Sequence, residues 1–381
     1  MSIPKFKDME RAYGFEEVAI VPGDITVNPD QTNTDLAIGN FTFSIPILAA
    51  AMDAIVDPNF AILTSKLGGL AILNLDGVQT RYENPEEILA EITKAPDSEV
   101  TSLLQKIYSQ PVKDNLIGER IQAIKRAGAT CAVSVIPATT KRLAPVAKEA
   151  GADILVVQST VTTARHISKS YRGLIFSELC QTASMPILVG NCVTYGAALE
   201  LMRTGIDGIL VGIGPGAACT TREVLGVGVP QVTATMDCAA ARDAHFKETG
   251  KYVAVITDGG IRTGSDLCKA FASGADAVML GSILAQAKEA PGRGYNWGMS
   301  HPHPALPRGT RIKVGTRASL EQLLFGPTSV TGGTENFVGA LRTAMGVCGA
   351  LTIKDMHKVK MVIAPSIKTE GKYFQAIQCM S

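Results

Sequence analysis

The sequence predicts an α/β protein built as a single eight-stranded parallel barrel, the (β/α)8 or TIM barrel fold. Eight short apolar segments occur within about 240 residues, and helix-like segments separate them. Each segment is continuously apolar rather than alternating, as expected of parallel strands covered on both faces. A doubly wound sheet is the alternative, but no GxGxxG motif follows the first strand as that fold would require. The number of strands favours the barrel.

The eight expected strands share a short apolar run that follows a turn or a helix end. Four of them begin with Gly, a small or apolar residue, and in three cases Asp, as in GADILVV and GADAVMLG. The glycine fits the position that ends the preceding helix. In chain order the expected strands are 45–52, 69–73, 128–135, 151–157, 185–191, 205–212, 252–257 and 274–281.

Two of the intervening helices have recognisable starts and apolar stripes. In 263–274, Ser265 is the expected cap, and the stripe consists of Leu267, Cys268 and Phe271. In 194–205, Thr194 is the expected cap, and the stripe consists of Tyr195, Leu199 and Met202.

Composition limits the possible function. The 381 residues carry a net charge of +1, so no basic field attracts nucleic acid or anionic membrane. The N-terminus lacks the apolar core of a signal peptide, and no apolar run is long enough to span a membrane. Eight scattered cysteines without a CxxC pair indicate free thiols in a reducing cytoplasm. The five histidines show no metal-binding spacing. We expect one cytoplasmic catalytic domain over 1–381.

Two stretches interrupt the alternation of strands and helices. Residues 77–118 are polar and predict an extra helix or two. Residues 290–334 are rich in Gly, Pro and Arg, and they follow the eighth strand. A loop of that length in a compact domain is usually functional or disordered. We expect 290–334 to be a flap that folds over the mouth of the barrel.

The segment GIGPGAACTTREV (212–224) is the first candidate for chemistry. It leaves the sixth strand, and barrel active sites lie at the carboxyl ends of the strands. Cys219 is therefore expected to act as a nucleophile, with its thiolate favoured by backbone N–H groups and by Arg222. The open backbone at Gly214 and Gly216 can hold an ion or a phosphate. The alternative is a tight turn that contains an inert thiol.

The seventh and eighth strands end in TDGGIRTGSD (257–266) and VMLGS (278–282). Glycine-rich loops after these two strands are the usual phosphate site of TIM barrels. Asp258 would repel a phosphate and is better suited to accept hydrogen bonds from ribose hydroxyls. The two loops together predict a phosphorylated sugar or nucleotide as ligand, although barrels that bind FMN have similar loops.

These segments resemble the IMP dehydrogenase and GMP reductase family. GIGPGAACTTREVLGVGVPQ is similar to that family's catalytic-cysteine loop, and ITDGGIRTGSDLCKAFASGADAVMLGS to its ribose- and phosphate-binding segment. FEEVAIVPG, PILAAAMDAI, LGGLAIL and GALRTAMGVCGA resemble its other signatures, so the likeness covers nearly the whole chain. It implies a TIM barrel that assembles as a homotetramer or octamer and acts on a purine mononucleotide.

The resemblance also implies roles for individual residues. Cys219 would attack C2 of the purine with assistance from Thr221, and Asp258 would hold the ribose. The remaining substrate contacts would be Met52, Asn191, Gly216, Gly260, Gly281, Ser282 and Met299, and the cofactor contacts Gln158, Ser159 and Thr160. The backbone carbonyls of Gly214, Gly216 and Cys219 would lie where IMP dehydrogenases bind potassium.

The choice between the two family reactions depends on the flap. Both proceed through a thioimidate that joins the cysteine to C2. IMP dehydrogenase, which uses NAD, then activates water with a flap Arg-Tyr pair, and the corresponding region here has no such dipeptide. The tandem CBS module of IMP dehydrogenases is also missing. Both absences favour a GMP reductase that uses NADPH, and the chain resembles a CBS-less branch of the family.

Several departures from the family pattern bear on the mechanism. No Asp or Glu lies between Glu289 and Glu321, whereas family enzymes have an acid in the flap. Ala217 replaces a phosphate-binding serine, Ala50 replaces a serine beside the base, and Gln158 replaces an Asp near the nicotinamide. A minimal IMP dehydrogenase and a non-catalytic nucleotide-binding partner of a family enzyme are the alternatives. An FMN-dependent barrel, which would not need the thiol, is a distant fourth.

Overall fold

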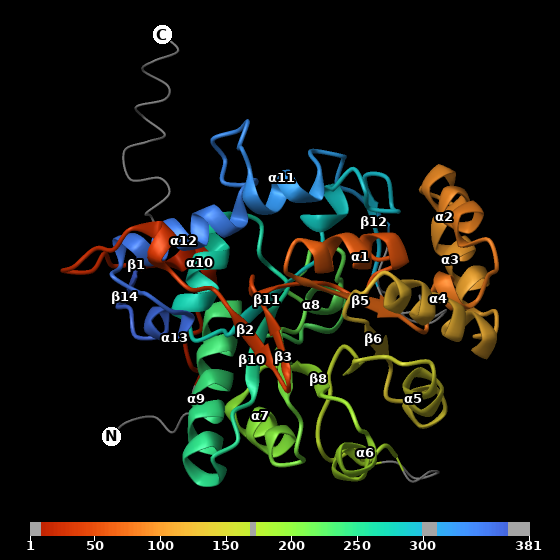
Figure 1. The fold of residues 1–381 in the computed structure, drawn as a ribbon, viewed down its shortest axis with the longest axis horizontal. Helices are drawn as coiled ribbons and strands as arrows, with labels where there is room; N and C mark the ends of the chain where they lie inside the picture. The colour runs from red at the N-terminus through yellow and green to blue at the C-terminus, as the bar shows by residue number, and fades with distance from the viewer. Residues whose placement is uncertain (1–8, 168–172, 299–310, 365–381) are drawn as a thin grey trace, which may run out of the picture.

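Eight parallel strands close into a barrel at the centre of the protein (Figure 1). The structure is a computed structural model that describes residues 9–167, 173–298 and 311–364. The order around the barrel is β10-β11-β4-β5-β6-β7-β8-β9. The strands are β4 (Ile47–Ala49), β5 (Leu70–Asn74), β6 (Ala132–Val135), β7 (Ile154–Gln158), β8 (Ile187–Cys192), β9 (Gly208–Val211), β10 (Ala254–Asp258) and β11 (Ala277–Leu280). The eight strands predicted from the sequence are the eight barrel strands, and the predicted fold class is confirmed.

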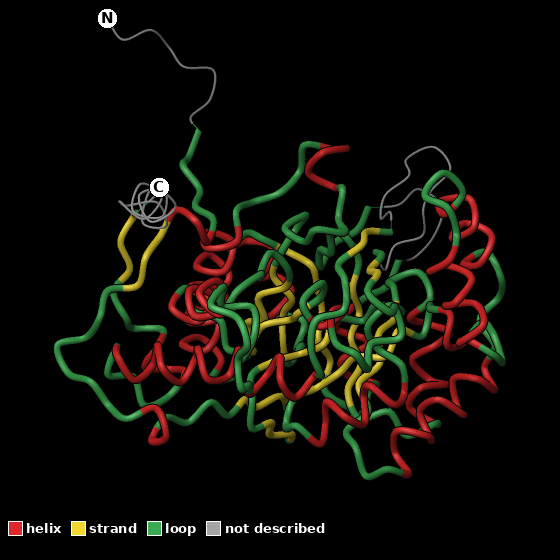
Figure 2. The backbone as a smooth tube through the Cα atoms, turned by 90° about the horizontal axis from the view of Figure 1, so that it is seen from above, coloured by secondary structure: helices red, strands yellow, loops and turns green. Residues whose placement is uncertain are grey.

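Helices surround the barrel, as the view from above shows (Figure 2). Within the described part of the chain they include α1 (Pro58–Lys66), α4 (Asp114–Arg126), α5 (Thr140–Glu149), α6 (Phe176–Thr182), α7 (Tyr195–Met202), α9 (Gln231–Thr249), α10 (Gly264–Ala272) and α12 (Phe337–Val347). Shorter helices are α8 (Thr221–Leu225), α11 (Leu320–Phe325) and α13 (Ile353–Met356). No described helix is long and apolar enough to cross a membrane.

Two details of these helices differ from the sequence prediction. Thr194 caps α7 as predicted, by accepting a hydrogen bond from the Ala197 backbone. In α10 the cap is Thr263, whose hydroxyl accepts from the backbone of Asp266, so the prediction of Ser265 was wrong. Tyr195 was also wrongly assigned to an apolar stripe, because 43% of it is exposed. At the start of a helix, a residue close to the cap can face solvent even when its spacing fits the buried face.

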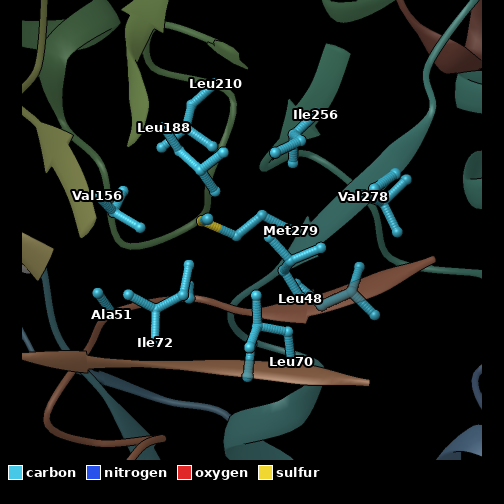
Figure 3. Packing of buried hydrophobic residues seen from close by; sticks show 14 of the residues in the cluster. Leu48, Ala51, Leu70, Ile72, Val156, Leu188, Leu210, Ile256, Val278 and Met279 are labelled. Atoms are coloured by element: carbon cyan, nitrogen blue, oxygen red, sulfur yellow. The ribbon is translucent and has the colours of Figure 1, made fainter. Parts of the chain in front are cut away.

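Apolar side chains fill the interior of the barrel. Figure 3 shows Leu48, Ile72, Val156, Leu188 and Met279 pointing toward one another from five different strands. All five are 1% exposed or less. Alternate residues of each strand face inward, so the barrel is a packed core and has no channel through it. A ligand can therefore bind only above this core, at an end of the barrel.

The end of the barrel opposite the carboxyl ends of the strands carries a hairpin. Strands β2 (Leu36–Ile38) and β3 (Phe41–Phe43) pair antiparallel. Gly39, in their turn, has a φ of +57°, and a Cβ added there would lie 2.4 Å from the ring of Pro186, just before β8. Only glycine allows this close approach. A second small sheet joins the two ends of the described chain, because β1 (Val18–Ile20) pairs with β14 (Met361–Ile363).

The two stretches that interrupt the strand-helix alternation lie side by side. Residues 77–118 contain α2 (Pro85–Lys94) and α3 (Val100–Tyr108), which stand beside α4 in Figure 1. Within 290–334, strand β12 (Tyr295–Asn296) pairs antiparallel with β13 (Ile312–Lys313). This strand pair joins the two described parts of the stretch, 290–298 and 311–334. Contacts between these parts and α2–α3 are described below.

Candidate active site

A cavity of about 600 Å³ opens at the carboxyl ends of the barrel strands. Its volume lies in the range of small-molecule sites. Residues at the ends of β4, β7, β8, β10 and β11 line it, together with the loop that follows β9. The side chain of Met279, from the core shown in Figure 3, forms part of its floor.

The predicted site residues that the structure describes all line this one cavity. They are Met52, Gln158, Ser159, Thr160, Asn191, Gly214, Gly216, Cys219, Thr221, Asp258, Gly260, Gly281 and Ser282. Met299 lies outside the described residues. Their roles stay predictions, but segments from six loops meet as the sequence analysis expected. Ala50 and Ala217, the two alanines at expected serine positions, line the same cavity.

Cys219 and Thr221 are joined by a hydrogen bond in the loop after β9. The Cys219 thiol donates a hydrogen bond to the Thr221 hydroxyl, with 3.1 Å between Sγ and Oγ1. Cys219 is the exposed cysteine among the seven that the structure describes, and Thr221 is 2% exposed. A thiol that is accessible from a cavity and fixed by a buried hydroxyl can attack a bound electrophile.

Arg222 stabilises the shape of this loop. Its Nε donates to the carbonyl of Ile213 at 3.0 Å, and its Nη2 donates to the carbonyl of Val229 at 2.6 Å. The guanidinium thereby bridges the start and the end of the segment that contains Cys219. Burial lowers the pKa of Arg222, and the neighbouring Cys219 thiol opposes that shift. The hydrogen bonds of Arg222 go to the backbone, and its predicted effect on the Cys219 thiolate stays a prediction.

Asp258 lies at the end of β10 with its carboxylate toward the cavity. The Asn191 amide, at the end of β8, donates to its Oδ2 at 2.7 Å. Burial raises the pKa of Asp258 to about 6, and the bond from Asn191 opposes the rise. The next residues turn sharply, since Gly260 has a φ of +78° and lies against Pro215 of the cysteine loop. A fixed acceptor and exposed backbone therefore occur next to each other, as ribose and phosphate binding require.

The cavity wall contains further polar groups at the ends of β7 and β11, which stand on opposite sides of the barrel. Gln158 donates to Ser134 at 3.1 Å, and the Ser159 hydroxyl bonds the carbonyl of Val161 at 2.9 Å. Asn296, in β12, donates to the Ser282 hydroxyl at 3.1 Å. Asn296 Oδ1 is buried and has no hydrogen-bond partner among the described residues, so this wall keeps an acceptor available to water or ligand.

Several residues of the cavity were not predicted from the sequence. Gly14, Phe15, Glu16 and Glu17 line it, and they are held by a bond from Lys269 Nζ to the carbonyl of Phe15 at 2.8 Å. Arg262 also lines it, with 63% of its side chain exposed. Its ion pairs are long, 3.6 Å to Glu16 and 3.7 Å to Asp266. The segment FEEVAIVPG was recognised in the sequence, but nothing in it indicates that Glu16 lies near the strand-seven loop.

The described residues contain no group of three or more His, Cys, Asp or Glu side chains that could hold a metal ion. His301 and His303 lie outside the described residues.

Comparison with known proteins identifies the family. The model of the IMP dehydrogenase / GMP reductase domain matches residues 12–300. The chain belongs to the IMP dehydrogenase/GMP reductase family. The crystal structure of an IMP dehydrogenase/GMP reductase-like protein from Corynebacterium glutamicum is 35% identical, with a TM-score of 0.90, and the likeness covers 95% of this chain and 97% of that one. An uncharacterized oxidoreductase of Mycolicibacterium smegmatis is 39% identical over 93% of this chain and 96% of its own length.

Relatives that are named for their activity include inosine-5'-monophosphate dehydrogenases. The one from Borreliella burgdorferi is 30% identical over 390 residues, covering 92% of this chain and 93% of its own length. A protein of that name can therefore be about as long as this chain. The lack of a CBS module is thus compatible with either family activity. What stands is that the chain is an oxidoreductase of this family.

Proposed function

We propose that the protein is a GMP reductase, which converts GMP and NADPH to IMP, ammonia and NADP. The observation that carries the proposal is the Cys219–Thr221 pair, beside which the described residues of the cavity include no Arg-Tyr pair that could activate water. The ionisable residues that line the described cavity, other than Cys219, are Glu16, Glu17, Arg222, Asp258 and Arg262. Arg222 is bound to two loop carbonyls, and Asp258 to Asn191.

The proton balance of the first step favours deamination. The thiol adds to C2 of the guanine, the C2–N bond breaks, and the thiol proton leaves with the amino group as ammonia. Because the Cys219 thiol donates to Thr221 Oγ1, that hydroxyl is placed to pass the proton toward the leaving amine. This step needs no further acid. The absence of any Asp or Glu between Glu289 and Glu321 is therefore compatible with it.

Completion of the dehydrogenase reaction would have a different requirement. Hydrolysis of the thioimidate consumes a water molecule, which must lose a proton as it attacks C2. The family solution, a flap Arg-Tyr pair, is missing from 290–334. In the reductase direction a hydride supplied by NADPH reaches C2 instead, and the thiolate leaves and regains a proton from solvent. We therefore infer that the reductase direction suits this chain better.

The polar wall around Gln158 is our proposed cofactor side. Gln158 is uncharged, so it can face a nicotinamide without the desolvation cost of the carboxylate found in relatives. Thr160 lines the cavity next to Ser159, whose hydroxyl is already bonded within the loop. Thr160 is the more available of the two hydroxyls. Choice of NADPH over NADH remains part of the proposal, and a comparison of the two cofactors at equal concentration tests it.

A potassium site at the carbonyls of Gly214, Gly216 and Cys219 is a further part of the proposal. The fit is partial, because the Gly216 carbonyl already accepts a hydrogen bond from the Cys219 backbone at 3.0 Å. A carbonyl has a second lone pair, which can still bind a cation. Activity in potassium chloride against sodium chloride at equal ionic strength tests the requirement. The expected homotetramer or octamer is tested by light scattering after size exclusion.

One assay separates the candidate functions. The purified protein is given GMP with NADPH and, separately, IMP with NAD, while dinucleotide absorbance is followed. Oxidation of NADPH that depends on GMP supports the reductase. Formation of NADH with IMP, without the first reaction, refutes it and supports the dehydrogenase. No turnover in either mixture, with nucleotide binding retained, supports a non-catalytic partner.

A further inference from the structure

The helical insertion α2–α3 is not required by the barrel. It contacts the 290–334 stretch at two places, in 290–298 and at the start of 311–334. On one side, Trp297 Nε1 donates to the Tyr108 hydroxyl at 2.9 Å. On the other side, Arg311 Nη1 donates to the carbonyls of Ile92 at 2.6 Å and Thr93 at 3.2 Å. Trp297 is 1% exposed and Tyr108 4%. The insertion therefore anchors the segment that follows the eighth strand at two separate points.

Additional contacts make the Arg311 anchor rigid. Arg311 also pairs with Asp97, and its guanidinium lies over the ring of Tyr295 at 4.5 Å from the ring centroid. Tyr295 belongs to β12, which pairs with β13 next to Arg311. The planar guanidinium is thus fixed by carbonyls at the end of one helix and by an aromatic ring on the other segment. A lysine could not make the same set of contacts.

The hydrogen bonds of the Tyr108 anchor continue to a second part of the cavity wall. The Tyr108 hydroxyl donates to Asp53 Oδ2 at 2.6 Å, and the backbone of Val78 donates to the same oxygen at 3.0 Å. Asp53 is 2% exposed and directly follows Met52, which lines the cavity. On the other side of Tyr108, Trp297 lies between Asn296 and Gly298, which line it as well. One hydroxyl therefore joins two parts of the cavity wall that lie more than 240 residues apart in the sequence.

We propose that Tyr108 is a positioning residue, which sets the place of Asn296, Gly298 and Met52 in the cavity wall through Trp297 and Asp53. It touches neither Cys219 nor Thr221, so it acts on how the ligand is held. The inference rests on the proposed function only in taking a purine nucleotide as the ligand. Helices α2 and α3 then contribute to nucleotide affinity, although neither contributes a cavity residue that we identified.

The test compares two tyrosine substitutions that remove the same kind of hydrogen bond. Tyr108→Phe keeps the ring, removes the donor to Asp53 and leaves Trp297 Nε1 without its acceptor. Tyr252→Phe is the matched control, because the Tyr252 hydroxyl also donates to a buried carboxylate, Asp276, at 2.6 Å. Tyr252 lies just before β10, at the other end of the barrel. Both variants are purified as the full chain.

Calorimetric titration with GMP and with IMP gives the result without requiring turnover. We expect Tyr108→Phe to weaken nucleotide binding roughly 2- to 30-fold, the usual range for coupling through a contact network, and Tyr252→Phe to leave it unchanged. In kinetic assays the same variant should raise KM more than it lowers kcat. Trp297→Phe, which removes only the indole donor, should weaken binding in the same direction.

Each outcome has a defined meaning. Binding by Tyr108→Phe and Trp297→Phe within twofold of the unmodified protein overturns the inference. An equal loss of affinity in Tyr252→Phe also overturns it, because the effect would then be a general loss of stability. If the unmodified protein binds neither GMP nor IMP, the proposed function fails first, which distinguishes that failure from this one.

Discussion

Replacing Asp258 by Asn should make the free protein more stable and at the same time weaken its binding of ribonucleotides. Burial raises the pKa of Asp258 to about 6 from an ordinary value of 3.8. At pH 8 the folded protein therefore holds a carboxylate that would be better solvated in water. Asn191 compensates only in part, with one hydrogen bond of 2.7 Å.

The size of the effect follows from the pKa change. A rise from 3.8 to about 6 corresponds to roughly 3 kcal/mol, at 1.36 kcal/mol per pKa unit. Because the carboxylate faces a cavity that water can enter, we expect about 1–2 kcal/mol after solvent screening. For a chain of 381 residues this is about 1–3 °C in the melting temperature.

The sign of the pH dependence is also fixed. An Asp whose pKa is raised by folding binds its proton more tightly in the folded state, so the free energy of unfolding falls as pH rises from about 4 to 6. The penalty is fully present above that window and absent below it. The amide of Asp258→Asn does not titrate. The variant should therefore melt higher at pH 8, and the difference should vanish toward pH 4.

Binding should change in the opposite direction. Loss of charge-assisted hydrogen bonds to the ribose costs about 1.5–3 kcal/mol, or roughly 10- to 150-fold in affinity. Thermal unfolding from pH 4.5 to 8 and calorimetric titration with GMP measure the two effects. A dideoxy nucleotide without the ribose hydroxyls is the matched ligand, because it should bind both proteins equally. A variant that is less stable at pH 8, or that binds GMP within threefold, would refute the reasoning.

Four further predictions concern the same cavity. Cys219→Ala should abolish turnover and retain GMP binding by calorimetry; residual turnover would contradict the covalent route. Thr221→Val should lower kcat about 100-fold or more with little change in KM, and Thr221→Ser should restore most of it, whereas equal kcat values for Val and Ser would exclude the hydroxyl from proton transfer. Arg262→Gln should raise KM for GMP roughly 3- to 10-fold without affecting guanosine binding, because its long ion pairs leave it available to the phosphate. Glu16→Gln should have the reverse effect, and equal changes for nucleoside and nucleotide would speak against a phosphate contact.

The barrel and most of its active face could be predicted from local sequence patterns. Continuously apolar strands are a consequence of burial on both faces, and each strand lies within one short window of sequence. Because the strands are parallel, every residue just after a strand lies at the same end of the barrel. That geometry alone brings Asn191, Cys219 and Asp258 to one cavity, although they are tens of residues apart.

What could not be predicted depends on contacts between distant side chains. Thr263 and Ser265 are both residue types that cap helices well. The residue at which the backbone becomes helical decides which of them is the cap, and α10 begins at Gly264. Arg222 was expected to act on the thiolate, and the carbonyls that take its hydrogen bonds carry no sequence signal. The bond between Tyr108 and Trp297 spans 189 residues. No local pattern indicates that the polar insertion 77–118 and the segment after the eighth strand will meet.

The position of the insertion changes how the absence of an Arg-Tyr pair from 290–334 is interpreted. Sequence comparison with the family suggests a weakened flap, because 290–334 has neither an Arg-Tyr pair nor an acid. Yet Trp297 and Arg311, at the two described ends of that stretch, are fixed to α2–α3 by buried hydrogen bonds. Such contacts are costly to leave unmade, so they hold their partners in place whether or not the flap performs chemistry. In our proposal the first step takes its proton from the Cys219 thiol. The segment after the eighth strand then needs only to shape the cavity. The insertion holds that segment in place through Trp297 and Arg311.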